Sequence, residues 1–207
     1  DLLSVPLYDA RAQLAIIPQD PFLFSGTIRT CLCSYSQMAA EGITPKDMPP
    51  GLEKIPDEKL WRVLEQVRMR EYFEKQPGGL DAKIAANGDN LSAGQRQLVC
   101  VARALLRDAP VVILDEATAQ VDRENDAIIQ STIRTVLADR VVIAIAHRIN
   151  TIIDFDRIIV MDAGEVKEFD TPKALLSNPE SLFSRLVARC EDAEDLYQKV
   201  RASGSQD

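Results

Sequence analysis

The stretch Val111-Val112-Ile113-Leu114-Asp115-Glu116 runs four apolar residues directly into two adjacent carboxylates. The apolar residues do not alternate with polar ones, so both faces of this strand are expected to be covered, as in a parallel sheet. Ligands bind beyond the carboxyl ends of such strands, which places Asp115 where a carboxylate suits Mg²⁺. Glu116, on the other side by alternation, could accept a proton from an attacking water. Solvated acids at a strand end are the alternative interpretation.

Three further apolar runs are predicted to form buried strands, namely Leu14–Ile17, Val141–Ala146 and Arg157–Met161. Helices are expected between them. One starts at Pro56-Asp57, carries an apolar stripe at positions 60, 64 and 67, and ends at Pro77-Gly78-Gly79; the others cover 92 to 107 and 122 to 137. Strands that alternate with helices predict an α/β layered architecture.

The remaining segments are predicted as connections or short elements. Residues 34 to 56 hold four prolines and are expected to be a loop or insertion. Asp162-Ala163-Gly164 is a turn into Glu165–Phe169, and Thr171-Pro172 caps a short helix with proline at its first position. The tail from Glu191 is polar and is either an extended helix or disordered.

Composition excludes several classes of protein. The 207 residues are 46% hydrophobic and 27% charged, which is typical of globular chains. A net charge of −8 provides no electrostatic footprint for nucleic acid or anionic lipid, so no nucleic acid partner is expected. The longest apolar run, Val141–Ala146, is of strand length, far from the roughly 18 residues of a membrane helix. Four cysteines without a paired CxxC set and one histidine build no zinc site, and reduced thiols are expected.

A second candidate site is the stretch Asn90-Leu91-Ser92-Ala93-Gly94-Gln95. Ser92 to Gln95 matches the capping box that marks a helix N-terminus. Such a terminus carries about half a positive charge and unpaired N–H groups, and Gly94 allows close backbone approach, so the stretch suits a phosphate group. An ordinary capping box is the alternative, and it leaves Gly94 unexplained.

Two polar residues follow other predicted strands. His147 comes directly after Val141–Ala146, on the same side as Asp115, and its imidazole could bond a γ-phosphate oxygen or position the hydrolytic water. A single histidine is more often structural, but a place beyond a buried strand favours function. Gln19 follows Leu14–Ile17 and Pro18, and its amide could touch a metal-bound water.

Taken together, these residues resemble the nucleotide-binding domain of an ATP-binding cassette (ABC) protein. The five motifs occur in the family's order over residues 12 to 170: Gln19 in the Q-loop, Leu91 to Gln95 in the signature, Val111 to Glu116 in Walker B, Asp122 in the D-loop, and His147 as the switch histidine. The sequence around these motifs, such as residues 20 to 29 and 130 to 134, is similar to the second nucleotide-binding domain of subfamily C exporters, the multidrug-resistance-associated type.

The chain departs from the family pattern at four points. It contains no G-x-x-x-x-G-K-[ST] stretch, so a C-terminal fragment that lacks the P-loop (Walker A) is expected. Ala93 stands where the commonest signature has glycine, and its methyl group could crowd the backbone approach to phosphate. Ala119-Gln120-Val121-Asp122 replaces the usual Ser-Ala-Leu-Asp but keeps the acid. Residues 36 to 56 are longer than the family's usual link and have no assigned role.

The resemblance implies an α/β fold. It would be a P-loop NTPase core of the ABC ATPase kind with a mainly parallel sheet, plus a helical signature subdomain, with the N-terminal P-loop portion missing. The implied division is a partial core with the Q-loop at 1–30, an insertion and helical subdomain at 31–107, core with Walker B, D-loop and H-loop at 108–190, and a polar tail at 191–207.

The resemblance also implies a function. ATP and Mg²⁺ would be the cofactors, with Glu116 and His147 catalytic, Asp115 and Gln19 at the metal, and Gln19, Ser92, Ala93, Gly94, Gln95 and Asp122 at nucleotide. A second nucleotide-binding domain would pair head to tail around ATP, beside transmembrane domains, at the cytoplasmic face of a membrane. The fragment alone is expected to be inactive. Two alternatives stay open: a truncated, non-hydrolysing cassette that only pairs with a partner domain, and a soluble ABC ATPase.

Overall fold

The computed structural model describes residues 4–33, 55–115, 123–146 and 148–203. The chain separates into two compact units, Asp1–Ile145 and Ala146–Asp207, and each is described by itself. The division into a core, a helical subdomain and a tail therefore stays a prediction. No helix within the described ranges is long and apolar enough to cross a membrane.

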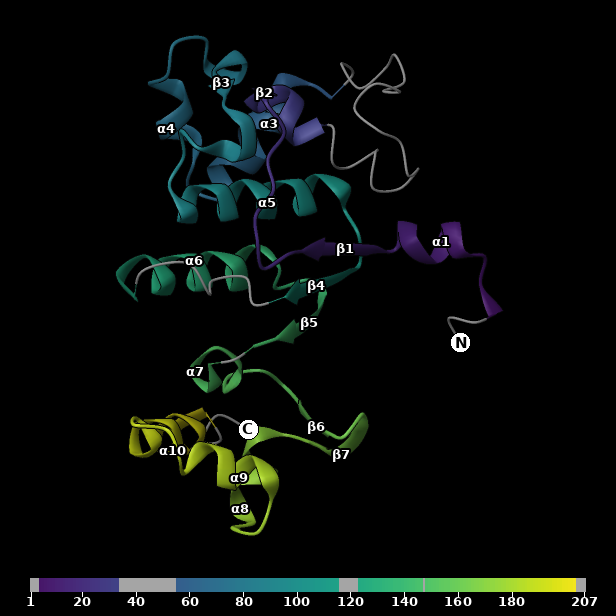
Figure 1. The fold of residues 1–207 in the computed structure, drawn as a ribbon, viewed down its shortest axis with the longest axis vertical. Coiled ribbons are helices and arrows are strands. Elements are labelled where there is room, and N and C mark those ends of the chain that lie inside the picture. The colour runs from purple at the N-terminus through teal and green to yellow at the C-terminus, as the bar shows by residue number, and fades with distance from the viewer. Residues whose placement is uncertain (1–3, 34–54, 116–122, 147, 204–207) are drawn as a thin grey trace. The chain divides into compact units, whose positions relative to one another are not determined.

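A three-stranded parallel sheet organises the first unit (Figure 1). Helix α1 (Leu7–Ala12) leads into β1 (Leu14–Ile17), which pairs with β4 (Val111–Asp115), and β4 pairs in turn with β5 (Val141–Ile145). The order β1-β4-β5 makes the quoted stretch 111–115 the central strand of this sheet. The parallel sheet predicted from that stretch is confirmed.

Two helices contribute apolar side chains to the core beside this sheet. Helix α5 (Ala93–Arg107) contacts both β1 and α6 (Arg123–Val136). Apolar side chains of both helices join one buried cluster with the inward residues of the strands, which include Ala15, Ile17, Val112 and Leu114. Because side chains alternate along a strand, one face of the sheet forms this core.

The other face of the sheet is less covered than expected. Val141, Ile143 and Ile145 of β5 are 60%, 49% and 55% exposed, and Ile16 of β1 is 48% exposed. The prediction of a buried strand at 141–146 is thus wrong for this face. The helices of the core cluster pack on the face of the sheet that carries Ala15, Ile17, Val112 and Leu114. Within the described part of the unit, the four side chains on the other face stay exposed.

A smaller layer packs on the opposite side of α5. It contains α3 (Asp57–Gln66), α4 (Arg70–Glu74), the short 3₁₀ turns η3 (Gly79–Asp81) and η4 (Ala86–Gly88), and the antiparallel pair β2 (Gly26–Thr27) and β3 (Lys83–Ile84). The predicted apolar stripe of α3 is buried against α5 and α4. The helix ends at Gln66, earlier than predicted, because Arg68 adopts a left-handed backbone conformation (φ 58°) that a helix cannot continue through.

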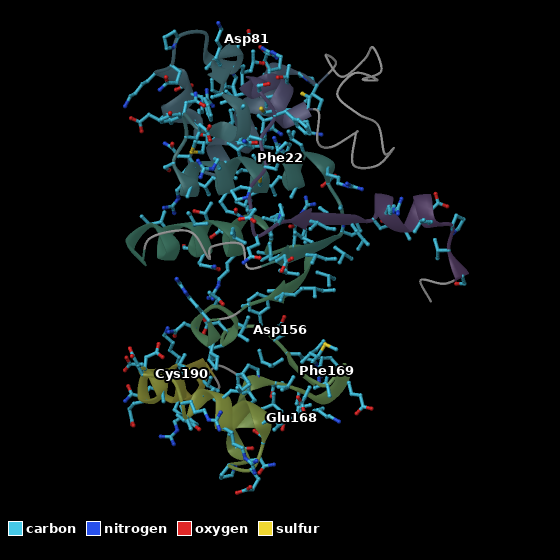
Figure 2. All side chains as sticks on the ribbon, in the orientation of Figure 1. Phe22, Asp81, Asp156, Glu168, Phe169 and Cys190 are labelled. Carbon is cyan, nitrogen blue, oxygen red and sulfur yellow. The ribbon has the colours of Figure 1, made fainter. Side chains whose placement is uncertain are left out.

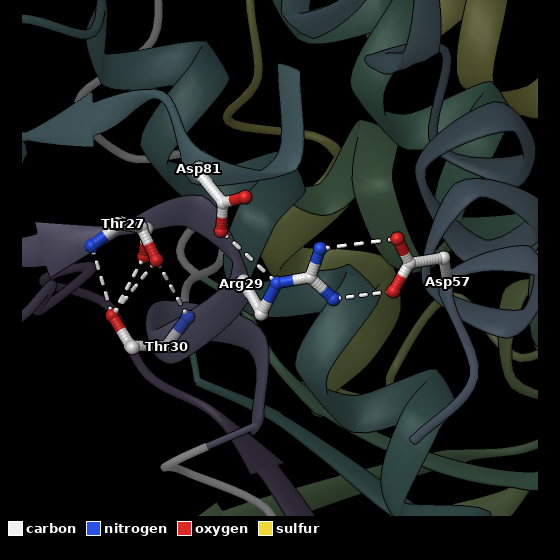
Figure 3. A network of polar contacts seen from close by, with 5 residues as sticks. All are labelled: Thr27, Arg29, Thr30, Asp57 and Asp81. Atoms are coloured by element: carbon white, nitrogen blue, oxygen red, sulfur yellow. Dashed lines mark hydrogen bonds and ion pairs between the residues drawn. The ribbon is translucent and has the colours of Figure 1, made fainter. Parts of the chain in front are cut away.

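An ion-pair network ties this layer together (Figure 3). The Arg29 guanidinium donates to both carboxylate oxygens of Asp57 and, through Nε, to Asp81. Beside it, the hydroxyl of Thr30 accepts from the backbone N–H of Thr27, and the hydroxyl of Thr27 accepts from the backbone N–H of Thr30. The network joins the chain after β2 to the start of α3 and to η3.

The second unit combines a hairpin with short helices. Strands β6 (Ile158–Asp162) and β7 (Glu165–Asp170) are antiparallel, and they are followed by α8 (Pro172–Ser177), α9 (Leu182–Val187) and α10 (Ala193–Ser203), with α7 (Ile149–Ile152) before them. The predicted buried strand at 157–161 is wrong for one face, since Ile159 and Met161 are 54% and 63% exposed. They lie opposite Phe169 and Val166 in the hairpin register, and Figure 2 labels Phe169 there. A two-stranded ribbon packs helices on one face only, and the other face stays open.

The C-terminal part of this unit is helical, which decides between the two alternatives for residues 193–203. Leu196 of α10 is fully buried with Phe183 and Val187 of α9. The polar composition did not reveal these contacts, because only Leu196 and Val200, one turn apart on α10, are buried apolar residues in its described side chains.

Candidate functional site

Two predicted site residues lie at or just beyond the ends of neighbouring parallel strands, at the same edge of the sheet. The register pairs Ile17, the last residue of β1, with Leu114; Asp115 follows Leu114 directly, and Gln19 follows Ile17 after Pro18. Asp115 is half-buried and Gln19 is exposed. A carboxylate and an amide at one edge of a sheet offer the oxygen ligands that Mg²⁺ prefers, so the residues present fit such an ion.

Three predicted residues lie outside the described parts of the chain, namely Glu116, Asp122 and His147. Glu116 follows Asp115 directly in the sequence, and His147 follows β5 after Ala146. The roles predicted for these three residues, including the convergence of His147 with the two acids, stay predictions.

The N-terminus of α5 is built as the sequence predicts. The Ser92 hydroxyl accepts from the Gln95 backbone N–H at 3.2 Å, and the Gln95 side chain accepts from the Ser92 backbone N–H at 2.9 Å. Ser92 is exposed, whereas Ala93, Gly94 and Gln95 are half-buried. A hydroxyl that accepts in a cap can still donate its own hydrogen, and a helix N-terminus attracts anions, so this end of α5 fits a phosphate oxygen.

The turn before Ser92 depends on one glycine. Gly88 has φ +70°, and a β-carbon there would lie 2.7 Å from Leu23 Cδ1 and 3.0 Å from Arg96 Cδ. Arg96 folds back over this turn and donates from Nη1 to the Leu91 carbonyl at 2.8 Å. Arg96 of α5 therefore holds the turn that leads into the signature stretch.

Sequence reasoning missed two buried polar residues on α5. Gln97 and Arg103 are each 1% exposed. Gln97 Nε2 donates to the Pro18 carbonyl at 3.5 Å, while Arg103 donates from Nη1 to the Phe22 carbonyl at 2.7 Å and from Nε to the Cys31 carbonyl at 2.8 Å. An arginine inside the apolar run 101–106 was a signal for such a contact, because a charge on the buried side of a helix requires partners.

The electrostatics around Arg103 are those of a buried cation beside thiols. Burial raises the pKa of the Cys31 and Cys100 thiols, and the positive charge of Arg103 opposes part of that rise. Cys33 is also buried, and burial raises its pKa while Arg29 opposes the shift. The three thiols are therefore protonated and unreactive at neutral pH.

A separate groove of about 380 Å³ lies between α3, α5 and α6. Its lining mixes both signs of charge, from Glu58, Lys59, Arg62, Asp108, Asp139 and Arg140 among others. The lining includes neither Asp115 nor Gln19, and none of the signature residues. The groove is therefore distinct from the carboxyl edge of the sheet.

Comparison with known proteins shows the family of the chain. The family described as "ABC transporter" matches residues 5–119, more than half of the chain. The chain is 46% identical over 201 residues to "ABC transporter C family member 3" of Dictyostelium discoideum, which covers 97% of this chain and 13% of that protein. It is 45% identical over 191 residues to "ATP-binding cassette sub-family C member 4" of Homo sapiens, and the match covers 92% of this chain and 13% of that protein.

A solved structure agrees in fold. The "Structure of a bacterial Atm1-family ABC exporter with ATP bound" matches with a TM-score of 0.70 at 30% identity, covering 87% of this chain and 28% of that chain. The chain thus spans about an eighth of the length of the curated relatives it matches. From the ordered motifs, the parallel sheet and these matches together, we conclude that the chain belongs to the ABC transporter family and is related to its sub-family C, the multidrug-resistance-associated type.

Proposed function

We propose that this chain is part of the ATP-binding and ATP-hydrolysing domain of an ABC exporter, which couples MgATP hydrolysis to transmembrane transport of organic or conjugated substrates. One observation carries the proposal. The parallel register of β1 and β4 brings Gln19 and Asp115 to one edge of the sheet, in a chain whose α5 begins with an anion-binding cap at Ser92.

The roles of the residues follow from their chemistry. Asp115 holds Mg²⁺ and Gln19 contacts its ligand shell, because both offer oxygen atoms. Glu116 orients or deprotonates the attacking water, and His147 donates a hydrogen bond to the γ-phosphate. Bound MgATP supplies the phosphoryl group and the free energy that drives transport.

The signature stretch contacts the nucleotide of a second, opposing nucleotide-binding domain. Ser92, Ala93, Gly94 and Gln95 act on the nucleotide held by an opposing nucleotide-binding domain, with which the domain pairs head to tail. Asp122 lies at that junction. Two surfaces that each offer N–H dipoles are attracted to the charge of one triphosphate, and hydrolysis weakens the attraction so that the pair opens. The domain would lie at the cytoplasmic face of a membrane, beside transmembrane domains of the same transporter.

The experiment is ATP turnover by the longer exporter in membrane vesicles. Glu116→Gln should lower turnover by about 10²- to 10⁴-fold, the range for loss of a general base, while MgATP binding is retained. The matched control is Glu165→Gln, which removes a carboxylate in the second unit. Unchanged turnover in the Glu116→Gln exporter would show that Glu116 does not serve the reaction.

A non-hydrolysing cassette is the second candidate, and one sequence fact favours it for this chain by itself: the 207 residues contain no G-x-x-x-x-G-K-[ST] stretch. We therefore expect the purified 207-residue chain to bind MgATP weakly and to hydrolyse it negligibly. Fast turnover by this chain that is abolished by Glu116→Gln would contradict this expectation.

A further inference from the structure

Two buried side chains of α5 hold the backbone on either side of Gln19. Gln97 donates to the carbonyl of Pro18, the residue before Gln19, and Arg103 donates to the carbonyl of Phe22, three residues after it. A second donor of Arg103 reaches the Cys31 carbonyl. We propose that Gln97 and Arg103 are positioning residues that fix the segment 18–22 to the signature helix, so that Gln19 and Ser92 move as one body. This inference rests on the proposed function.

Packing alone does not account for an arginine at position 103. The side chain is 1% exposed within an apolar cluster, where burying a guanidinium is unfavourable unless its donors find acceptors. A leucine, as at positions 105 and 106, would fill apolar space without that requirement. The two short bonds of Arg103 go to backbone carbonyls, and its longer contact, 3.9 Å from Nη1 to Cys100 Sγ, stays within α5. Arg103 therefore fixes the path of the chain at Phe22 and Cys31.

A movement of the N-terminus of α5 would also move the segment 18–22, because one helix connects them. Ser92 caps the start of the helix, and Arg103 lies eleven residues later in the same unbroken helix, a span of roughly 16 Å. The short bond to Phe22, at 2.7 Å, and the longer contact to Pro18, at 3.5 Å, restrain the segment at two points. In the proposed function Ser92 serves the opposing nucleotide and Gln19 serves the domain's own, so α5 with its two attachments links the two nucleotide sites.

Local proteolysis of the 207-residue chain tests the attachment. Phe22 is 52% exposed and can be cut by chymotrypsin once its backbone is released (Figure 2). Arg103→Met should speed cleavage at Phe22 and Phe24 by at least about tenfold relative to cleavage at Tyr72 and Phe73, and Arg103→Lys should restore part of the protection. The matched control is Arg107→Met on the same helix, because Arg107 donates to the Arg11 carbonyl and not to the segment 18–22.

The outcomes are distinct. A general loss of stability would raise cleavage at all four sites together and leave the ratio unchanged, which would overturn the inference. If Arg103→Met does not fold, Gln97→Leu provides the same comparison, because it removes the bond to Pro18 without burying or exposing a charge. Equal ratios for Gln97→Leu and wild type would then count against the positioning role.

The longer exporter tests the link to catalysis. Gln97→Leu should lower kcat for ATP by about tenfold or more while KM for ATP changes less than about twofold, since misplacing a positioned group slows chemistry without removing the main phosphate contacts. A wild-type kcat in Gln97→Leu would overturn the inference and leave the proposed function intact. If the wild-type exporter hydrolyses no ATP, the proposed function fails, and the cleavage ratio alone decides whether α5 holds the segment.

Discussion

The guanidinium of Arg29 and the carboxylate of Asp57 form a two-pronged ion pair, with Nη1–Oδ1 at 2.5 Å and Nη2–Oδ2 at 3.1 Å (Figure 3). The two residues are 28 positions apart, and Asp57 is the first residue of α3. A parallel pair of N–H···O bonds is the strongest geometry that arginine offers a carboxylate. The contact therefore fixes where α3 starts relative to the chain that follows β2.

The first prediction is a pH dependence of this ion pair. The hydrogen bonds from Arg29 lower the pKa of Asp57 from the ordinary aspartate value of about 3.9. Because the folded-state pKa is lower than the unfolded one, the stabilisation is fully present above about pH 5 and is lost as pH falls through the folded-state pKa. The urea midpoint of the wild type, followed by Trp61 fluorescence, should exceed that of Asp57→Asn at neutral pH and converge with it in acid.

The control for this prediction is Glu58→Gln. It removes a carboxylate from the same turn of α3 but takes no part in the Arg29 network. Its difference from wild type should stay small at every pH. A gap between wild type and Asp57→Asn that stays constant down to strongly acid pH would be incompatible with the lowered pKa.

The second prediction separates the two roles of Ser92. Ser92→Ala should destabilise the chain by about 1 kcal/mol because the capping hydroxyl is lost, whereas Ser92→Asn should retain most of the stability because asparagine also caps helices. Urea unfolding measures this difference. Both variants lack the hydroxyl that is proposed to contact phosphate, so both should lower ATP turnover in the exporter, and Ser92→Thr should retain it. Full activity of Ser92→Asn would limit Ser92 to a structural cap.

The third prediction concerns Glu168, which is labelled in Figure 2. Its two carboxylate oxygens accept from the backbone N–H groups of Leu182 and Phe183, at 2.6 and 3.0 Å, at the start of α9. Glu168→Gln has one carbonyl oxygen left and leaves one N–H group unpaired, which should destabilise the second unit by about 1–2 kcal/mol. Hydrogen exchange of the α9 amides measures the loss. Glu165→Gln in the same hairpin should leave these amides protected as in wild type.

The fourth prediction contrasts the two faces of the sheet. Val112 is fully buried, whereas Ile143 on β5 is 49% exposed. Val112→Thr keeps the shape of the side chain but buries a hydroxyl, and should cost about 1–3 kcal/mol. Ile143→Thr should cost less than about 1 kcal/mol, because threonine suits a strand and its hydroxyl stays in water. Equal losses in the urea unfolding of the two variants would mean that the outer face is covered in solution.

The sequence predicted the elements of the core sheet well because they depend on local patterns. The apolar run ending in Asp115 predicted a parallel strand, and the pattern from Ser92 to Gln95 predicted the start of α5. Both signals lie within a few neighbouring residues, where backbone geometry and capping are decided. The resemblance of the motifs to the ABC family predicted the same arrangement of sheet and helix.

The features that sequence reasoning missed depend on contacts between distant residues or on one backbone angle. The helix from Asp57 ends early because Arg68 takes a left-handed conformation, which nothing in its residue type demands. The outward faces of β5 and β6 are as apolar as the inward ones, so periodicity could not tell which face is open. The bonds from Arg103 reach residues 72 and 81 positions away, beyond any local pattern.

Three buried thiols in the first unit become accessible to reagents only when the structure around them opens. Cys31, Cys33 and Cys100 are 1%, 4% and 5% exposed, whereas Cys190 in the second unit is half-buried. An alkylating dye should therefore react with Cys190 first, and the slower reaction of the other three thiols would measure how fast the first unit opens around α5. The alkylation rates of the native cysteines thus measure local unfolding without an engineered label.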